Sequence, residues 1–126
     1  MRGGLVASAH DCSDGGLATA LAECCFGADS GATTDIGGIW GDCESLDEWG
    51  ALFGESLGRI LVSVRPTDCS AFERAMHGHA CYHIGRVSEG DQITVNRGER
   101  AVSYTHLRAH ETRGNLVCRL LLEKKK

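Results

Sequence analysis

Hydrophobic residues in the first third of the chain recur with the spacing of a helix. Between residues 17 and 26 the apolar positions fall on one helical face. Ser13 precedes this stretch as a predicted N-cap, and Gly27 follows it as a predicted left-handed stop. The apolar run at residues 3–8 predicts a short buried strand. The chain is therefore expected to begin with a strand, a tight polar turn and a helix.

The middle of the chain is rich in glycine, and one short strand is expected there at residues 32–36. Ser45 and Glu48 have the spacing of an S-x-x-E capping box, which predicts the start of a short helix. The apolar positions of that helix are expected to form a buried stripe, which consists of Leu46, Trp49, Leu52 and Phe53.

Strands and helices continue to alternate beyond this point. Residues 59–64 predict a strand, and Pro66 opens a helix that is expected to stop at Gly78. Two further strands are expected at residues 81–87 and 92–95, joined by the turn SEGD. This order indicates an α+β fold in which helices pack on a mixed sheet.

The last 25 residues, 102–126, break the pattern, because they mix charged and apolar positions without a helical or strand period. The stretch VSYTHLRAHET at 102–112 resembles a transposase sequencing adapter translated in frame, and LVCRLLL at 116–122 resembles a translated flow-cell primer. We therefore expect residues 1–101 to be a partial natural domain. Residues 102–126 are expected to be a non-native, adapter-derived tail.

A natural basic C-terminal helix that docks on a partner or a membrane is the alternative for this tail. The adapter interpretation accounts for the segment codon by codon. His106, His110 and Cys118 are therefore left out of every argument about metal sites. On this interpretation the natural chain continues past Arg100 or Ala101.

The composition is that of one globular domain, with 126 residues, 42% hydrophobic and 24% charged. A net charge of -4 gives no broad attraction to nucleic acid or to an anionic membrane. No apolar run approaches the ~20 residues of a membrane helix, and the N-terminus lacks the apolar centre of a signal peptide. These features predict a cytoplasmic protein that binds neither nucleic acid nor membranes.

The seven cysteines form no C-x-x-C pair, and their number is odd. Without a secretion signal, reduced thiols packed as small apolar residues are expected in preference to a disulfide framework. Cys12 lies close to a predicted helix N-terminus, a position that lowers the pKa of a thiol. Because no base stands at a fixed spacing from it, small apolar packing is the favoured interpretation.

The stretch AHDCSDGG, residues 9–16, is the first candidate for chemistry. Gly15 and Gly16 at the start of a helix would leave backbone N–H groups open to an anion or a close ligand. Asp11 and Asp14 would repel a bare phosphate, so they suit sugar hydroxyls, bound Mg²⁺ or structural capping better. Local chemistry leaves a ligand-binding turn and a merely well-capped helix equally open. His10 could likewise donate a hydrogen bond to a phosphate or to a backbone carbonyl oxygen.

A second stretch, HGHACYH, holds His77, His79, Cys81 and His83 and resembles a Zn²⁺ or copper site in residue type. It spans a helix end and a strand start, and its alternation is also that of residues facing solvent. We therefore expect no metal site here, and a stand-alone module binding a metal or an anion is the weakest functional alternative.

Three blocks in order carry a resemblance to a known family: SAHDCSDGGLATALAE, ALFGESLGRILVSVRP and HIGRV. They resemble the C-terminal AIR-synthetase-like (PurM-like) domain of the PurL family, the synthetase subunits of phosphoribosylformylglycinamidine synthase. The resemblance covers nearly all of residues 3–96 and implies a truncated PurM-like C-terminal domain. Related hydrogenase-maturation and selenophosphate-synthesis proteins share the aspartate and the glycine-rich turn, and a part of such an enzyme is the alternative.

The resemblance implies a part of an ATP-dependent C–N ligase of purine biosynthesis. The family converts formylglycinamide ribonucleotide, ATP and ammonia from glutamine into the amidine, with Mg²⁺ neutralising the nucleotide phosphates. It implies as partners the remaining synthetase domains, a glutaminase that supplies ammonia, and a nucleotide substrate. ATP and Mg²⁺ are expected in the parent enzyme and no cofactor in this chain alone, which is predicted to be inactive.

The resemblance also implies which residues matter. No catalytic residue is expected in this part, and the positions implied to bind substrate are His10, Asp11, Ser13, Asp14, Gly15, Gly16, Glu55, Ser56 and Arg59. Leu57 stands where the E-S-Q block of the family has glutamine. This departure leaves open whether the turn grips substrate or serves as a pseudo-symmetric scaffold.

Overall fold

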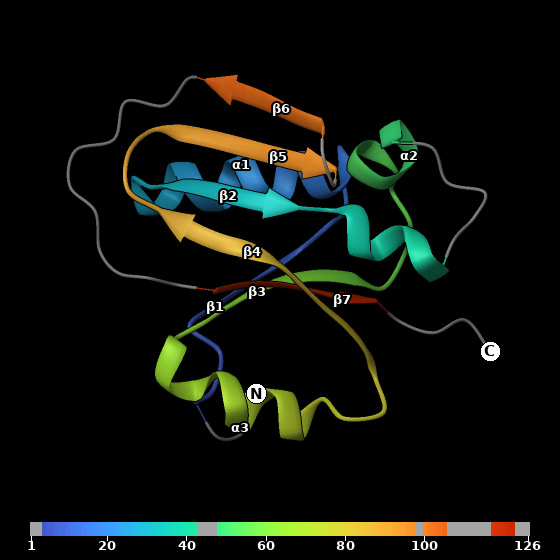
Figure 1. Ribbon diagram of the computed structural model, residues 1–126, viewed down its shortest axis with the longest axis vertical. Helices are drawn as coiled ribbons and strands as arrows, with labels where there is room; N and C mark the ends of the chain where they lie inside the picture. The colour runs from blue at the N-terminus through green and yellow to red at the C-terminus, as the bar shows by residue number, and fades with distance from the viewer. Residues whose placement is uncertain (1–3, 43–47, 98–99, 106–116, 123–126) are drawn as a thin grey trace.

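The computed structural model describes residues 4–42, 48–97, 100–105 and 117–122, with side chains for 4–39 and 49–96. Its strands are β1 (Ser8–Asp11), β2 (Gly31–Asp35), β3 (Arg59–Val64), β4 (Ala80–Ser88), β5 (Gln92–Arg97), β6 (Arg100–Thr105) and β7 (Val117–Leu122). Its helices are α1 (Gly16–Ala28), α2 (Glu48–Phe53) and α3 (Cys69–Ala75), with 3₁₀ turns η1 (Gly37–Asp42) and η2 (Pro66–Asp68). The strands form one sheet in the order β1-β3-β7-β4-β2-β5-β6 (Figure 1).

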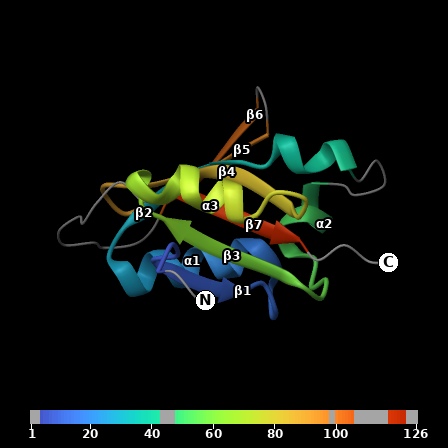
Figure 2. The ribbon, with the colours of Figure 1, turned by 90° about the horizontal axis from the view of Figure 1, so that it is seen from below.

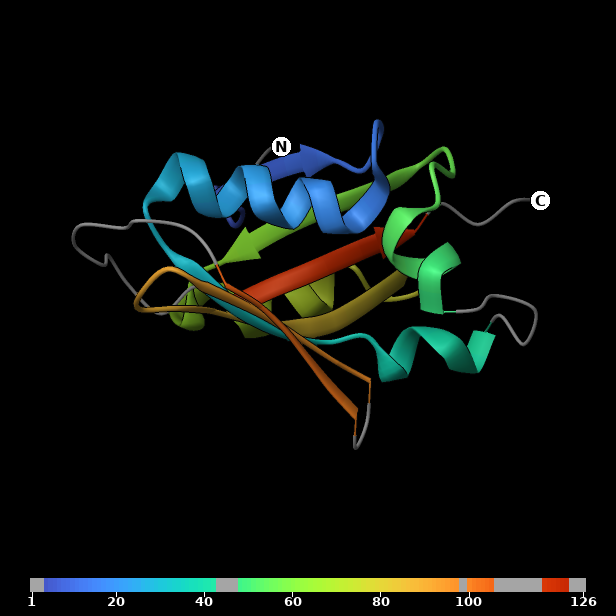
Figure 3. The ribbon, with the colours of Figure 1, turned by 90° about the horizontal axis from the view of Figure 1, so that it is seen from above.

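The sheet is the middle of three layers. Helix α3 lies on one face of the sheet (Figure 2), and α1 lies on the opposite face (Figure 3). Strand β3 serves both layers, because Leu61 belongs to the core under α1 whereas Val62 and Val64 belong to the core that includes Phe72 of α3. The core under α1 is the larger one and includes Leu17, Leu21, Ile36, Ile84 and Val95. The expected α+β fold with a mixed sheet is confirmed.

Strand β7 is an interior strand of the sheet and pairs antiparallel with both β3 and β4. Since β3 and β4 are both antiparallel to β7, they run parallel to each other and are connected through α3. Although residues 102–126 show no strand period in the sequence, β6 extends into this segment through residue 105 and β7 lies within it.

The strands at residues 59–64 and 31–35 follow the sequence prediction closely, and the strand at the start of the chain does not. Leu5 and Val6 precede the strand, and β1 begins only at Ser8. Most of β1 is exposed, because it is the edge strand of the sheet. The prediction of a buried apolar strand at residues 3–8 was therefore wrong. Its two large apolar residues instead pack from outside the strand against the core under α3.

The ends of α1 also differ from expectation. Gly15, with φ of 78°, takes the N-cap position that we predicted for Ser13, so the N-cap residue has no side chain with which to cap the helix. The helix runs through Gly27, and the left-handed stop falls at Asp29, with φ of 47°. An aspartate tolerates this conformation better than most residues with a side chain.

The predicted buried stripe of α2 was wrong for its aromatic residues. Leu52 is buried, but Trp49 is 63% exposed and Phe53 is 43% exposed. Leu46 and Ser45 of the predicted capping box lie outside the described residues. The helix therefore buries one apolar face and exposes a second one.

Candidate functional site

The polar turn between β1 and α1 is tied to the start of β3. Asp11 is the last residue of β1, and the N–H of Cys12 donates to the carbonyl oxygen of Arg59 at 2.9 Å. Cys12 is buried, whereas Asp11, Ser13 and Asp14 are exposed. The backbone thus turns inward at one residue and presents the neighbouring polar side chains to solvent.

Gly16 makes the closest approach in this turn. Its φ is 69°, and a Cβ atom at this position would lie 2.7 Å from the carbonyl oxygen of Leu52 and 2.8 Å from that of Gly54. Only a glycine fits both the conformation and the space. The end of α2 therefore lies directly against the start of α1, and this contact brings the GES segment at residues 54–56 to the turn.

The two glycine amides of the turn already have acceptors within the chain. The N–H of Gly15 donates to Oε1 of Glu55 at 3.0 Å, and the N–H of Gly16 donates to the carbonyl oxygen of Ser13 at 3.3 Å. The hydroxyl of Thr19 donates to the carbonyl oxygen of Gly15 at 3.1 Å. The carboxylate of Glu55 thus holds the position at the helix N-terminus where an anionic ligand would bind.

Arg59 holds the loop that carries Glu55. Its guanidinium group is buried and donates to the carbonyl oxygen of Gly54 at 3.0 Å and to that of Ala51 at 2.7 Å. These two bonds fix the end of α2 from inside. Arg59 is therefore a structural support for the turn, and its charged end does not face solvent where a substrate would bind.

His10 makes two contacts that the sequence did not reveal. Its Nδ1 lies 2.7 Å from the carbonyl oxygen of Asp11, and its Nε2 lies 2.9 Å from Oε2 of Glu23 on α1. Both ring nitrogens therefore lie within hydrogen-bond distance of an oxygen atom of the chain. No sequence spacing signals the partnership with Glu23, because the two residues come from different elements.

The structure brings most of the implied site residues together in one open surface. Glu55 reaches the turn that contains Asp11, Ser13 and Asp14, and Ser56 follows it in the chain; all five are exposed. Gly15 and Gly16 form the backbone between the two segments, whereas His10 and Arg59 are engaged with protein groups. The surface is acidic and lacks open glycine amides, so it suits hydroxyl groups better than a phosphate.

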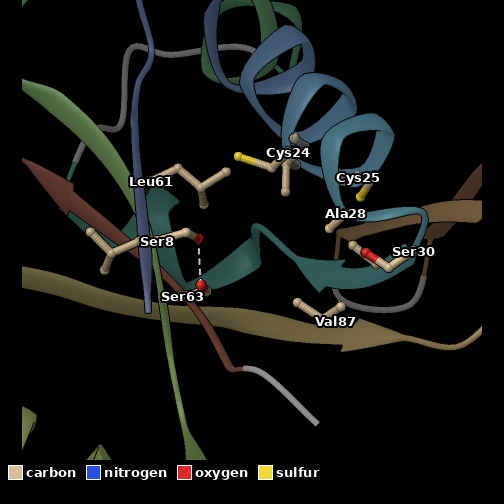
Figure 4. A pocket seen from close by; sticks show the side chains of 11 residues that line it. Ser8, Cys24, Cys25, Ala28, Ser30, Leu61, Ser63 and Val87 are labelled. Carbon is tan, nitrogen blue, oxygen red and sulfur yellow. Dashed lines mark hydrogen bonds between the residues drawn. The ribbon is translucent and has the colours of Figure 1, made fainter. Parts of the chain in front are cut away.

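A separate small cavity lies between α1 and the sheet (Figure 4). The hydroxyls of Ser8 and Ser63 are hydrogen-bonded at one side of it, and Cys24 and Cys25 line it from the helix. Its volume of about 60 Å³ is far below the roughly 300 Å³ or more of a ligand pocket. It contains none of the implied site residues and is too small for a nucleotide.

Burial makes the described thiols around this helix weak acids. Desolvation raises the pKa of Cys12, and the nearby Asp11 adds to the rise while Arg59 opposes it. Desolvation also raises the pKa of Cys24, and that of Cys25 to about 11. The interpretation of Cys12 as a small packed residue is supported over that of a reactive thiol. No disulfide joins the cysteines of the described part.

The histidine-rich stretch does not assemble a metal site in the part of the chain that the structure describes. No group of three or more histidine, cysteine or acidic side chains within these residues is placed to hold an ion. His77 and His79 are exposed around the end of α3, and Nε2 of His83 lies 3.1 Å from the carbonyl oxygen of Gly85. Among the described helices, none is long and apolar enough to cross a membrane.

Comparison with known proteins gives a consistent result. Residues 1–98 match the family described as "AIR synthase related protein, C-terminal domain". The PurL subunit of phosphoribosylformylglycinamidine synthase from Lactobacillus helveticus (strain DPC 4571) is 40% identical over 95 residues, covering 75% of this chain and 12% of that protein. The same subunit from Synechococcus sp. (strain JA-2-3B'a(2-13)) is 52% identical over 73 residues, covering 58% and 9%.

A third PurL subunit, from Parafrankia sp. (strain EAN1pec), is 39% identical over 114 residues, which cover 87% of this chain and 14% of that protein. The chain thus spans between 9% and 14% of the length of these curated relatives. No solved structure matches the chain.

Proposed function

Because the chain belongs to the family of the AIR synthase related C-terminal domain, we propose that it is one domain of a longer phosphoribosylformylglycinamidine synthase. The longer enzyme would be an ATP-dependent ligase that converts formylglycinamide ribonucleotide into formylglycinamidine ribonucleotide with ammonia from glutamine. The identity of 40–52% to two PurL subunits supports this proposal. The weaker alternative is that the chain is a part of a hydrogenase-maturation or selenophosphate-synthesis enzyme.

The observation that carries the proposal within this chain is the hydrogen bond between Gly15 and Glu55. It joins HDCSDGG and GES, which belong to two of the three blocks on which the family resemblance rests. Blocks that are separated by forty residues in sequence are thus one structural unit. Such a contact is expected if the two blocks act together as one site in the longer enzyme.

The turn does not fit the phosphates of ATP. Glu55 already accepts the Gly15 N–H, Gly16 donates to Ser13, and Asp11 and Asp14 add negative charge. A phosphate group would have to displace one carboxylate and approach two others. We therefore assign ATP, Mg²⁺ and the reacting atoms to other domains of the longer enzyme, and no catalytic residue to this one.

The role left to this domain is to support the synthetase and to offer a polar wall to its nucleotide substrate. The exposed oxygen atoms of Asp11, Ser13, Asp14 and Ser56 can accept hydrogen bonds from sugar hydroxyls. His10 and Arg59 act behind them as positioning residues. The hydrophobic Leu57, in place of the family's glutamine, favours the supporting role over a direct grip on substrate.

The proposal has consequences for partners and for the tail. The remaining synthetase domains and a glutaminase that delivers ammonia would be the partners, and the enzyme would work in the cytoplasm. Residues 102–126 are proposed to be adapter-derived; the family match ends at residue 98, whereas the Parafrankia alignment covers 87% of the chain and therefore extends beyond residue 101. Strand β7 would then occupy a place in the sheet that another segment fills in the natural protein.

A domain exchange tests the proposed function. Residues 1–98 replace the matched segment of the Lactobacillus helveticus subunit, and the rate of formylglycinamidine ribonucleotide formation is measured with glutaminase, ATP and Mg²⁺. We expect the exchanged enzyme to be active and the unmodified full chain alone to be inactive. A correctly folded but inactive exchange, or turnover by the chain alone, would contradict the proposal.

A further inference from the structure

Helix α2 has apolar residues on two opposite sides. Ala51 and Leu52 are each 3% exposed and belong to the core that α1 covers. Trp49 and Phe53 point away from that core, with exposed fractions of 63% and 43%. A helix that is apolar on both sides is typical of one that lies between two partners, and within the described residues a core covers only one of those sides.

The exposed side of α2 carries Trp49 and Phe53, and we call these two residues, together with the exposed Leu57 that follows them in the chain, the α2 apolar patch. The two aromatic rings stack with their centroids 5.7 Å apart. Leu57 follows one loop later and is 90% exposed. Single exposed hydrophobic residues are ordinary, but three large ones within nine positions, two of them in ring contact, mark an interaction site.

The patch is held rigidly. The guanidinium group of Arg59 binds the carbonyl oxygens of Ala51 and Gly54, which flank the exposed end of the helix. The backbone of Leu52 to Gly54 lies against Gly16 with no room for a side chain there. Because the scaffold is fixed before a partner binds, little conformational entropy is lost on binding.

The chain spans 9–14% of the length of its relatives, so under the proposed function most of the enzyme lies in other domains that could cover the patch. The three side chains expose on the order of 400 Å². A stable dimer needs about 800 Å² on each partner, whereas interfaces between domains of one chain start at about 600 Å² in total. The area therefore favours an intramolecular partner over a second copy.

We propose that the α2 apolar patch is the docking surface for another domain of the longer synthetase, which covers Trp49, Phe53 and Leu57 with an apolar face of its own. This inference rests on the proposed function. The docked domain would lie beside the Gly15–Glu55 contact, since Glu55 stands between Phe53 and Leu57 in sequence. The patch thus fixes where the neighbouring domain meets the polar turn.

Hydroxyl-radical footprinting with mass spectrometry tests this assignment, because it reports the exposure of individual side chains. The full chain is compared with the domain exchange in the Lactobacillus helveticus subunit. Oxidation of Trp49 and Phe53 should be slower in the exchanged enzyme by roughly five-fold or more, as for residues at an interface core. Phe26 is the matched control, because it is 59% exposed and lies about 15 Å from Gly16 along α1.

Equal oxidation of the patch in the free chain and in a folded exchange would overturn the inference. Sedimentation of the full chain as a dimer, with Trp49 and Phe53 protected in it, would also overturn it in favour of a second copy. If the first exchange does not fold, the same exchange into the Synechococcus relative replaces it. Enzyme activity is read separately, so an active exchange with an unprotected patch rejects only the docking inference. A protected patch in an inactive exchange rejects only the proposed function.

Discussion

The carboxylate of Glu55 accepts the N–H of Gly15 at 3.0 Å across forty residues of sequence. The bond places the negative charge of the Glu55 carboxylate at the N-terminus of α1, where the helix dipole favours an anion. It also explains why Ser13 is not the N-cap. An acceptor from a distant segment already serves the backbone at that end.

Replacement of Glu55 by alanine should destabilise the full chain by about 1 kcal/mol, the usual value of one charge-assisted bond at a partly solvated position. The free energy of unfolding is measured by urea denaturation. Glu89→Ala, in the exposed turn after β4, is the control and should change it by less than about 0.5 kcal/mol. Equal effects of the two substitutions would show that the Glu55 bond contributes nothing.

Two glycine substitutions in α1 should have opposite effects on stability. Gly16→Ala places a Cβ 2.7 Å from the carbonyl oxygen of Leu52 at a positive φ, so we expect a loss of roughly 2 kcal/mol or more. Gly27→Ala meets nothing within 4 Å inside the helix and should add about 0.5–1 kcal/mol. Thermal melts of both variants measure the difference. Similar melting temperatures would contradict the close packing of α2 on the turn.

Arg59→Lys should be costly although it keeps the charge. A single ammonium group cannot reach both carbonyl oxygens that the guanidinium group now binds. We expect a loss of about 2 kcal/mol in the free energy of unfolding. Arg65→Lys is the control, because its ion pair with Asp68 is exposed and 3.8 Å long. It should cost less than about 0.5 kcal/mol.

The thiol of Cys25 should make stability fall at alkaline pH. Its pKa is raised from 9.0 to about 11, mainly by burial, so the folded state favours the protonated thiol. The stabilising contribution is fully present below about pH 9 and is lost as the pH rises through about 11. Urea denaturation of the native chain and of Cys25→Ala at several pH values measures the effect. A native curve that falls no more steeply than that of the variant would disprove it.

The same rise in pKa predicts slow alkylation. At pH 8 roughly one Cys25 side chain in a thousand would be a thiolate. Iodoacetamide labelling followed by mass spectrometry should therefore be slow at pH 8 and should accelerate towards pH 10. A rate at pH 8 equal to that of a small free thiol would contradict the buried position.

Strand β7 fills the space between β3 and β4, so a proline in it should open the sheet. Leu120→Pro removes a backbone donor from a strand that pairs on both sides, opposite Leu61 and Tyr82. We expect a large loss of stability, measured by circular dichroism on heating. Hydrogen exchange in β3 and β4 should rise in parallel. An unchanged melt would show that the sheet does not depend on this strand.

The sequence predicted those elements whose signals are local. Strand β3 at Arg59–Val64 follows from its apolar alternation, and β2, expected at residues 32–36 within a glycine-rich stretch, was placed within one residue. Helix α1 was found from its period, but its N-cap was not. That end is set by Glu55 and by the packing of Leu52 against Gly16, which are contacts between distant segments.

The periodicity of α2 also predicted which residues are apolar but not which side faces the core. Leu52 is buried and Phe53 is largely exposed, although both belong to the predicted stripe. The candidate site was likewise predicted only in part. The blocks around Asp11 and Glu55 were identified from the sequence, whereas the contact between His10 and Glu23 depends on how β1 and α1 pack.

The central claim is that this chain is one domain of a longer synthetase and not a complete protein. Sequencing of the genomic locus on both sides of the codons for residues 1–101 tests it most directly. We predict one continuous reading frame about eight times as long, in line with a match that covers 12% of a relative, and natural codons in place of residues 102–126. A frame that starts at Met1 and stops after Lys126, with that short product present in cells, would contradict the account.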